Sequence, residues 1–418
     1  MMAADVPSLR HLRMFETVAR LESVSRAAVE VGRSQPAVTQ ALAKIERSLG
    51  VELIERRHAG SYLTASGQIF LLRNQRLFAR VERALAEPLV GAPFVDHARL
   101  RPVMGRLSSN HVLCLVGMAP DRAAAALRTA VTTRTLLRSV REVERILDRR
   151  ITRHGAHGTS LNPAGVELAR QLHLALKEIE YAREEIAAAR GVAQATISIG
   201  AMPQCATIVL TSAIEELMRR VPGAQVKVAS GPYDLLLGEL RSGKLDLLFG
   251  VLRKPDWATD VDEEALFEAP YAIIVRKQHP LARKRRLSLD DLAAYDWILP
   301  KHGTPRHLAF ERMFAGRVHK PRSSIETNRS DLQVMLIAGS DRVTMMSAHE
   351  AGWLKDRGSV SVLDFCPSVE RRCDGIATRT DWHPTAASRR FLDILRERSR
   401  SVGGSQERST GRAHPALA

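Results

Sequence analysis

The sequence predicts a multidomain protein: an α-rich N-terminal part containing two winged helix-turn-helix units, followed by an α/β domain of two lobes. Three observations carry this prediction. The 418 residues exceed one ordinary core, apolar residues recur at helical spacing before residue 190, and strand and helix patterns alternate after residue 195. The expected parts are 7–90 (first winged unit and following helix), 100–160 (degenerate second winged unit), 162–191 (linker or dimerisation helix), 195–395 (two-lobed domain) and 399–418 (disordered tail).

The charge balance favours a polyanionic partner. The chain has 62 Lys and Arg against 46 Asp and Glu, a net charge of +16. Such an excess is typical of proteins that approach nucleic acid. With 45% hydrophobic and 26% charged residues, most of the chain is nevertheless able to bury a core.

Cysteine usage and hydropathy indicate a cytoplasmic protein with no membrane partner. The start of the chain lacks the apolar core of a signal peptide, and no run approaches the roughly 18 apolar residues of a membrane span. The four cysteines have no zinc-finger spacing, so we interpret them as packing or surface thiols and expect no metal. They are Cys114, Cys205, Cys366 and Cys373.

The first helices have the pattern of a helix-turn-helix. Apolar residues recur at three- and four-residue steps over 9–20, and Ser23 or Ser25 is placed to cap a second helix that Gly32 ends. A third helix is expected to begin with Ser34 as N-cap and Pro36 in its first turn. Two helices joined by a glycine-containing turn, with polar groups at the start of the second, form this motif.

Polar and basic side chains gather at the start of the third helix and in the segment that follows. Gln and Thr hydrogen-bond base edges, while Arg and Lys hold the DNA backbone. Residues 51–67 form two extended stretches around Gly60, which predicts a hairpin wing with a basic tip. The candidate DNA-binding residues are Arg33, Ser34, Gln35, Pro36, Thr39, Gln40, Lys44, Arg56, Arg57 and His58.

This segment resembles the winged helix-turn-helix of the LysR-type transcriptional regulators. The residues that carry the resemblance are Ala27-Ala28, Ser34-Gln35-Pro36-Ala37-Val38-Thr39, Ile45-Glu46, Leu49-Gly50-Val51, Leu53, Arg56, Leu63-Thr64 and Gly67. Ile54 departs from the family, which often has Phe there. The resemblance implies promoter or operator DNA and RNA polymerase as partners, and a homodimer or homotetramer paired through the helix after the wing. Packing inside the monomer explains the apolar stripe of that helix, 65–89, equally well.

The motif returns when 98 is added to the numbering. Ile45-Glu46-Arg47 falls on Val143-Glu144-Arg145, and Gly67 on Gly165, without a gap. This agreement indicates an internal duplication; the alternative is chance similarity between Ala- and Leu-rich helices. The second copy has lost the polar edge, which is replaced by Thr132-Thr133-Arg134-Thr135, but residues 101–160 carry a net charge of +7. Backbone contact with DNA therefore remains a hypothesis for this copy.

Two further features adjoin the second copy. His154 and His157 lie three residues apart on its wing, but without a third ligand nearby we expect no metal there. The helix after Pro163 is long and apolar on one side, and it leads directly into the next domain. We therefore consider it the better candidate for a dimerisation helix.

From residue 195 strands and helices alternate, which predicts a parallel sheet covered on both faces and a crossing into a second lobe near 269–282. Leu240–Leu248 and His279–Ala282 resemble the co-inducer domain of the same family, which has the fold of type 2 periplasmic binding proteins. A ligand is expected between the lobes at the carboxyl ends of the strands. The candidate ligand-binding residues are Met202, Pro203, Gln204, Ser230, Gly231, His302, Thr304, Asn328, Ser330 and Ser347.

The sequence thus predicts a DNA-binding transcriptional regulator whose activity a small anionic or polyhydroxylated metabolite modulates. The alternative is a cytoplasmic small-molecule-binding protein or an enzyme that uses the two-lobed domain. A Gly-rich phosphate loop, a G-x-S-x-G nucleophile elbow and clustered metal-ligand spacing are all missing from the sequence. We therefore expect no enzymatic activity and no cofactor.

Overall fold

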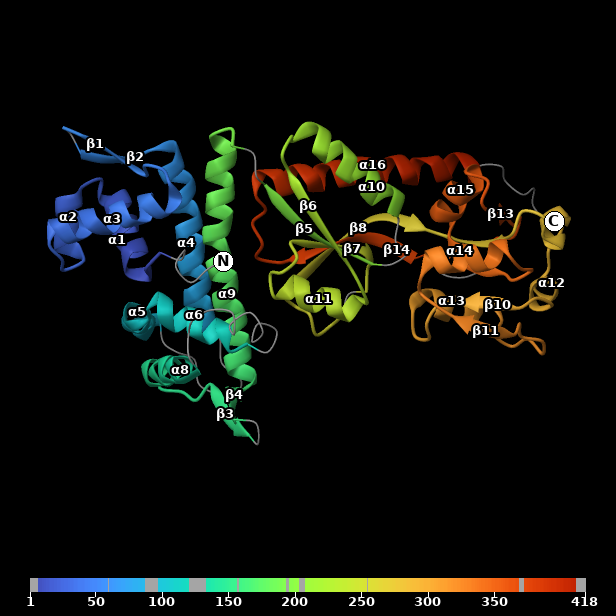
Figure 1. The fold of residues 1–418 in the computed structure, drawn as a ribbon, viewed down its shortest axis with the longest axis horizontal. Coiled ribbons are helices and arrows are strands. Elements are labelled where there is room, and N and C mark those ends of the chain that lie inside the picture. The colour runs from blue at the N-terminus through green and yellow to red at the C-terminus, as the bar shows by residue number, and fades with distance from the viewer. Residues whose placement is uncertain are drawn as a thin grey trace, which may run out of the picture. The chain divides into compact units, whose positions relative to one another are not determined.

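The chain forms two compact units, residues 1–194 and 195–418, in the computed structural model (Figure 1). The structure describes residues 7–58, 60–86, 97–119, 133–155, 158–192, 195–202, 207–253, 255–367 and 372–410. Within these residues, no helix is both long enough and apolar enough to cross a membrane.

The first winged helix folds as its turn and cap residues predict. The Ser23 hydroxyl accepts a hydrogen bond from the Arg26 amide at 3.3 Å, Pro36 lies in the first turn of the third helix, and Gly50 ends that helix with φ +68°. The elements are α1 (Leu9–Leu21), α2 (Val24–Glu30), α3 (Gln35–Leu49), the antiparallel wing β1 (Ile54–Arg57) and β2 (Gly60–Leu63), and α4 (Ala65–Ala86).

A close backbone approach joins the wing to α4. A Cβ on Gly67 would lie 2.1 Å from the carbonyl oxygen of Leu53, so only glycine fits there. The Thr64 hydroxyl accepts a hydrogen bond from the Gly67 amide at 3.0 Å and so caps the helix.

A second series of elements repeats the first at an offset of 98 residues. α8, β3 and β4 have the bounds of α3, β1 and β2 shifted by 98, and α9 begins 98 residues after α4. The positions that correspond to α2, including Ala125-Ala126, lie outside the described residues. The elements are α5 (His97–Arg106), α6 (Ser109–Gly117), α8 (Thr133–Leu147), β3 (Thr152–Gly155), β4 (Gly158–Leu161) and α9 (Pro163–Ala189).

The two series also share hydrogen bonds at the same offset. Glu46 Oε1 accepts from the amides of Leu53 and Ile54 at 2.8 and 3.2 Å. Glu144 Oε1 accepts from the amides 98 residues later, those of Ile151 and Thr152, at 2.9 and 3.0 Å. In each series one partly buried carboxylate therefore fixes the start of the wing against the preceding helix.

The helix ends and helix starts correspond as well. Asp148, which replaces Gly50, keeps the left-handed conformation with φ 51°. Asn162 caps the Gly165 amide at 2.9 Å, and a Cβ on Gly165 would lie 2.2 Å from the carbonyl oxygen of Ile151.

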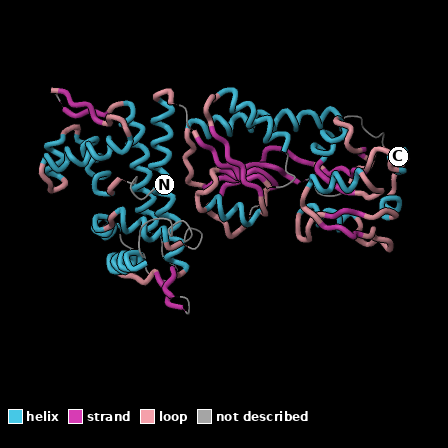
Figure 2. Tube along the Cα trace, viewed as in Figure 1, coloured by secondary structure: helices cyan, strands magenta, loops and turns pink. Residues whose placement is uncertain are grey.

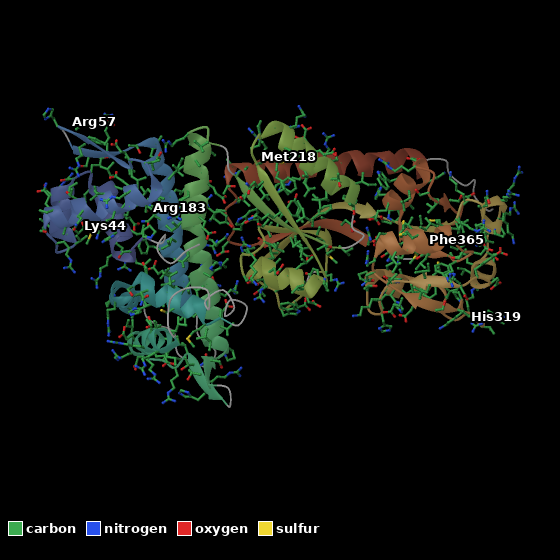
Figure 3. All side chains as sticks on the ribbon, in the orientation of Figure 1. Lys44, Arg57, Arg183, Met218, His319 and Phe365 are labelled. Carbon is green, nitrogen blue, oxygen red and sulfur yellow. The ribbon has the colours of Figure 1, made fainter. Side chains whose placement is uncertain are left out.

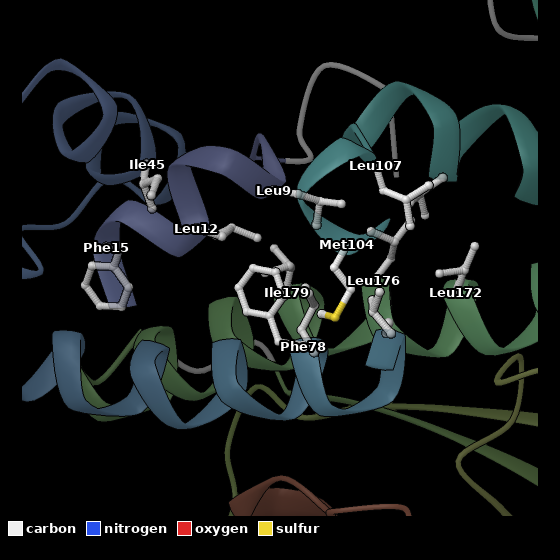
Figure 4. Packing of buried hydrophobic residues seen from close by; sticks show 14 of the residues in the cluster. Leu9, Leu12, Phe15, Ile45, Phe78, Met104, Leu107, Leu172, Leu176 and Ile179 are labelled. Carbon is white, nitrogen blue, oxygen red and sulfur yellow. The ribbon is translucent and has the colours of Figure 1, made fainter. Parts of the chain in front are cut away.

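The helices α4 and α9 pack against each other inside the chain. One apolar core joins both winged series to this pair, and Figure 4 shows Phe15 of α1, Phe78 of α4 and Ile179 of α9 within it. The apolar stripe of α4 is therefore covered by a helix of the same chain, as the packing alternative of the sequence analysis states.

The first lobe of the second unit is a five-stranded sheet of order β6-β5-β7-β14-β8, with helices against it (Figure 2). β5, β6 and β7 are parallel, but β14 is antiparallel to both β7 and β8, so the prediction of a parallel sheet is wrong for these strands. The elements are β5 (Thr196–Ala201), α10 (Thr207–Arg220), β6 (Gln225–Ser230), α11 (Tyr233–Arg241), β7 (Leu247–Val251), β8 (Val261–Ala269), β14 (Arg372–Arg379) and α16 (Ala386–Thr410).

The second lobe has an antiparallel sheet of order β12-β9-β13 and a parallel pair β10-β11. Trp297 of β10 is fully buried and packs against Phe310 and Phe314. The elements are β9 (Tyr271–Val275), α12 (Leu289–Ala293), β10 (Trp297–Leu299), α13 (Pro305–Met313), β11 (Ser323–Glu326), α14 (Ser330–Ala338), β12 (Thr344–Ser347), α15 (Ala348–Asp356) and β13 (Ser361–Val362).

The predicted disordered tail begins too early. α16 continues to Thr410, and Ser399 is 1% exposed with its hydroxyl donating to the Leu395 carbonyl at 2.7 Å. The Ser- and Arg-rich composition misled the prediction because α16 packs on α10 and β8, which keeps the beginning of this segment in the helix. Residues 411–418 lie outside the described residues.

The matched glycines give a stability prediction. Gly67→Ala and Gly165→Ala should each destabilise the first unit by roughly 1–3 kcal/mol, because a methyl group would displace a backbone carbonyl. Urea unfolding followed by helical circular dichroism measures this loss. All four Trp lie in the second unit, so their fluorescence transition should not move. Gly105→Ala in α5, whose added methyl meets no atom closer than 3.8 Å, is the control; an equal loss there would contradict the explanation.

Candidate nucleic-acid interface and ligand cleft

The start of α3 presents an exposed polar edge. Arg33, Ser34, Gln35 and Pro36 are exposed. Ser34 is the N-cap residue, but its side chain makes no capping hydrogen bond. Its hydroxyl and the first amides of the helix therefore face solvent at a helix N-terminus, where partial positive charge favours phosphate.

The edge continues along α3. Gln40 and Lys44 are exposed and Thr39 is half-buried, while Val38 and Ile45 are buried in the core. Lys44 projects from the surface of the first unit in Figure 3. The helix thus separates a scaffold face from a face able to contact a ligand, as the sequence predicts.

The wing carries the remaining predicted basic residues. Arg56, Arg57 and His58 are exposed at the hairpin tip, and Figure 3 shows Arg57 there. Arg57 pairs with Glu55 at 2.9 Å, and the hydrogen bond raises the pKa of Arg57 and lowers that of Glu55. Arg57 therefore has an internal partner that competes with phosphate.

A cleft of about 410 Å³ lies between the two lobes of the second unit. Five of the predicted ligand-binding residues line it: Met202, Gly231, His302, Thr304 and Asn328. They follow strands or begin helices in both lobes, which agrees with the expected place at the carboxyl ends of the strands.

The other five predicted residues have different places. Pro203 and Gln204 lie outside the described residues. Ser230 ends β6 without lining the cleft, and Ser330 lines a separate groove beside α10. Ser347 is buried and caps α15 by accepting from the Glu350 amide at 3.3 Å.

Cationic side chains that the sequence analysis did not identify line the cleft. Arg253 and Lys301 each lie two residues beyond the end of a strand and could have been found by that signal. Arg306 lies one residue inside α13 and donates to the Met345 carbonyl at 2.9 Å. Arg372 begins β14, a strand that was not predicted, so no local signal identified it.

Two helix N-termini add to this positive potential. Residues 231–234 at the start of α11 and 303–306 at the start of α13 line the cleft from opposite lobes. Thr304 accepts from the His307 amide at 3.4 Å and holds the start of α13. The helix N-termini on both walls, the exposed Arg253 and Lys301, and the buried Arg306 and Arg372 give the cleft a positive character that suits carboxylate or phosphate oxygens.

A buried carboxyl group lies behind the cleft. Asp374 is fully buried, and burial raises its pKa to about 6 although Arg372 lies 3.0 Å away and opposes the shift. Arg372 also lies over the Tyr271 ring, 6.0 Å from its centroid. The carboxyl therefore holds a cleft arginine in place from the protein side.

His302, His307 and Glu311 could together hold a metal ion, with ligand atoms within 4.8 Å of one another. His307 Nδ1 contacts the Pro300 carbonyl oxygen at 3.0 Å, and its Nε2 lies 3.4 Å from Glu311. No metal was predicted from the sequence, in which these three residues span a loop and the following helix. In the second wing, His154 contacts Thr159 at 3.0 Å, and His157 lies outside the described residues.

Comparison with known proteins assigns one family model to the first winged helix and another to the two-lobed unit. Residues 9–68 match the family model of the bacterial regulatory helix-turn-helix protein, lysR family, and residues 190–400 match that of the LysR substrate binding domain.

Two curated relatives and one solved structure show further similarity. The HTH-type transcriptional regulator GalR of Pseudomonas putida is 27% identical over 411 residues, covering 95% of this chain and 98% of GalR. GbpR of Rhizobium radiobacter, also an HTH-type transcriptional regulator, is 26% identical over 271 residues, covering 63% of this chain and 88% of GbpR. A mutant of OxyR from Corynebacterium glutamicum is 18% identical with a TM-score of 0.43, covering 99% and 98% of the two chains.

The Glu55–Arg57 pair in the wing predicts a gain of affinity. Glu55→Gln should strengthen binding to DNA of unrelated sequence a few-fold and steepen its salt dependence by about one, because Arg57 becomes available to a phosphate. Fluorescence anisotropy over a salt series measures both quantities. Glu52→Gln removes the same charge from an exposed position nearby, and an equal gain in that control would contradict a specific role for the pair.

Proposed function

This chain belongs to the LysR family of bacterial transcriptional regulators, and we propose that the polar edge of α3 reads an operator while the cleft of the second unit binds a small anionic metabolite. The protein is a DNA-binding regulator with an effector-binding domain, not an enzyme. The observation that carries the assignment of the edge is the exposure of Arg33–Pro36 and of Gln40, whose side chains are not buried in the core.

The polar edge and the wing divide the work of DNA binding in this proposal. Gln35 and Gln40 carry amides able to pair with adenine in the major groove. The Ser34 hydroxyl makes no capping hydrogen bond to α3. Pro36 fixes the first turn that presents them. Arg33, Lys44, Arg56 and the other basic groups of the wing hold phosphates, which sets position and general affinity.

An anionic effector fits the chemistry of the cleft. Arg253 lies 4.7 Å from the Tyr233 ring, and both line the cleft with Lys301 and Arg306. Asp234 is the acidic residue among the described lining. Tyr233 and Tyr271 supply flat apolar surface beside these cations, so a carboxylate or phosphate on a compact carbon skeleton is the ligand class that we propose.

The effector would act through a difference in its affinity for open and closed arrangements of the lobes. Closure would change an assembly of two or four chains on the promoter and its contact with RNA polymerase. We therefore propose a location in the bacterial cytoplasm, where a regulator meets its operator. A binding protein or enzyme that uses the cleft alone is disfavoured, because the exposed edge and basic wing would then have no use.

We also propose that residues 97–161 are a second winged-helix unit, with α9 as the helix after its wing. The coincident bounds, the matched Glu46 and Glu144 contacts and the matched Gly67 and Gly165 approaches support a duplication. Unrelated helices have no reason to share hydrogen-bond partners at one fixed offset.

The division of roles in DNA binding predicts opposite defects. Gln35→Ala should reduce the preference for operator over unrelated DNA by about tenfold and change general affinity little, since a good bidentate base contact contributes roughly 1–3 kcal/mol. Arg56→Ala should weaken both DNAs equally and lower the salt slope by about one. Competition binding with an operator selected from random DNA measures these effects. Equal losses of both kinds in both variants would refute the division.

The cleft predicts a charge-dependent ligand profile. In a thermal-shift screen of carboxylates, sugar phosphates and neutral sugars, charged members should raise the Tm of the wild type. Arg253→Gln should weaken the best of them about tenfold, because a charge-assisted hydrogen bond contributes roughly 1.5–3 kcal/mol. Arg276→Gln, which removes an arginine paired with Asp341 outside the cleft, is the matched control. Stabilisation by neutral sugars alone would argue against an anionic effector.

A further inference from the structure

The α4–α9 pair relates the two winged units to each other. Arg73 contacts both Glu178 and Glu185, while Arg80, two turns further along α4, contacts Glu178. Moving forward along α4 thus corresponds to moving backward along α9, so the helices are antiparallel. Two related helices that cross in this way have the arrangement of a two-fold dimer, built here within one chain.

Buried charges specify this pairing. Arg73, Arg80 and Glu178 are at most 5% exposed. Arg73 Nη1 lies 2.9 Å from Glu178 Oε2, and its Nε and Nη2 bind Glu185 at 2.9 and 2.7 Å. Burial lowers the pKa of Arg73, but the hydrogen bonds from Glu185 and Glu178 outweigh it and raise the pKa above its ordinary value. The guanidinium therefore stays charged and depends on α9 for its partners.

The repeat makes one of these contacts informative. Positions 80 and 178 correspond under the 98-residue offset, and they contact each other with opposite charges at 3.2 Å. Pairing α4 with a second α4 would set Arg80 against Arg80, and pairing two α9 helices would set Glu178 against Glu178. A buried like-charge contact disfavours both. The helices are thus matched to each other rather than to their own copies.

Contacts away from the helix pair also join the two winged units. The Ser109 hydroxyl at the start of α6 donates to the Pro7 carbonyl and accepts from the Leu9 amide, both at 2.9 Å. Met104 and Leu107 lie in the same core as Leu9 and Leu12, as Figure 4 shows. The second winged unit is therefore held at a fixed place beside the first winged unit.

The second winged unit presents a basic surface at the positions that correspond to the proposed DNA-binding edge of the first winged unit. Arg134 and Arg138 of α8 correspond to Pro36 and Gln40 of α3, and both are exposed. Further exposed arginines follow on α8 and toward the wing: Arg141, Arg145, Arg150 and Arg153. Three acidic residues lie among them: Glu142, which is 3.5 Å from Arg138, Glu144, whose carboxylate accepts from the amides of Ile151 and Thr152, and Asp148. The six arginines outnumber these acids, so the surface keeps a net positive charge.

We propose that one chain contacts DNA through both winged units, which the α4–α9 pair holds as an intrachain pseudo-dimer. The first winged unit reads bases, and the second winged unit binds phosphates through its arginines without reading sequence. The proposal rests on the proposed DNA-binding function of the first unit. It predicts a footprint of two separated segments for each chain, only one of which contains selected bases.

The basic surface is tested with Arg134→Ala/Arg138→Ala in the full chain on a selected operator. This variant should lose protection of the segment without selected bases and lower the salt slope by about two, with base preference unchanged. Arg285→Ala/Arg286→Ala removes two exposed arginines from the second lobe and is the control. A footprint and salt slope equal to those of the wild type would overturn the inference. Loss of base preference in Gln35→Ala tests the first unit separately, so the two failures are distinguishable.

The intrachain pairing is tested by charge exchange. Arg80→Glu and Glu178→Arg alone should each lower the Tm of the first unit, and combining them in one chain should recover part of the loss. Refolding the two single variants as a mixture should recover none, because each α4 pairs with the α9 of its own chain. Recovery in the mixture would show pairing between chains and would overturn the pseudo-dimer.

Discussion

The contact between α4 and α9 fixes the architecture of the first unit, and its buried ion pairs are the constraint within it. Glu178 pairs with both Arg73 and Arg80, and all three side chains are buried. Removing Glu178 takes a partner from both arginines at once, and breaking a buried ion pair costs about 3–5 kcal/mol. Apolar packing alone would accept several helix registers. The ion pairs form in only one register, and in that register the two winged units lie at opposite ends of the antiparallel α4–α9 pair.

The second unit depends on a different constraint, the return of the chain from the second lobe. β14 enters the first sheet between β7 and β8, antiparallel to both. Arg372 at its start reaches the cleft, where it joins Arg253 and Arg306 from other segments, and Asp374 holds it from within the sheet. The positive potential of the cleft is thus assembled from distant parts of the sequence, while the helix N-termini come from local turns.

The duplication that we propose would give one chain two different surfaces. Contacts that build the fold were kept at both copies, as Glu46 and Glu144 show. Arg134 and Arg138 of α8 stand where α3 has Pro36 and Gln40. This difference replaces a surface able to hydrogen-bond bases by a positively charged one.

The sequence alone determined the elements and the family, because apolar periodicity, caps and turn glycines are local signals; it placed α3, the wing and most strands within a few residues. It also identified the 98-residue repeat, and five of its ten predicted ligand-binding residues line the cleft. Only the tertiary structure decided which helix covers α4, where β14 inserts, and that Arg306 and Arg372 face the cleft while Ser347 caps a helix. These features depend on contacts between residues far apart in the chain, and no local pattern specifies a partner at that distance.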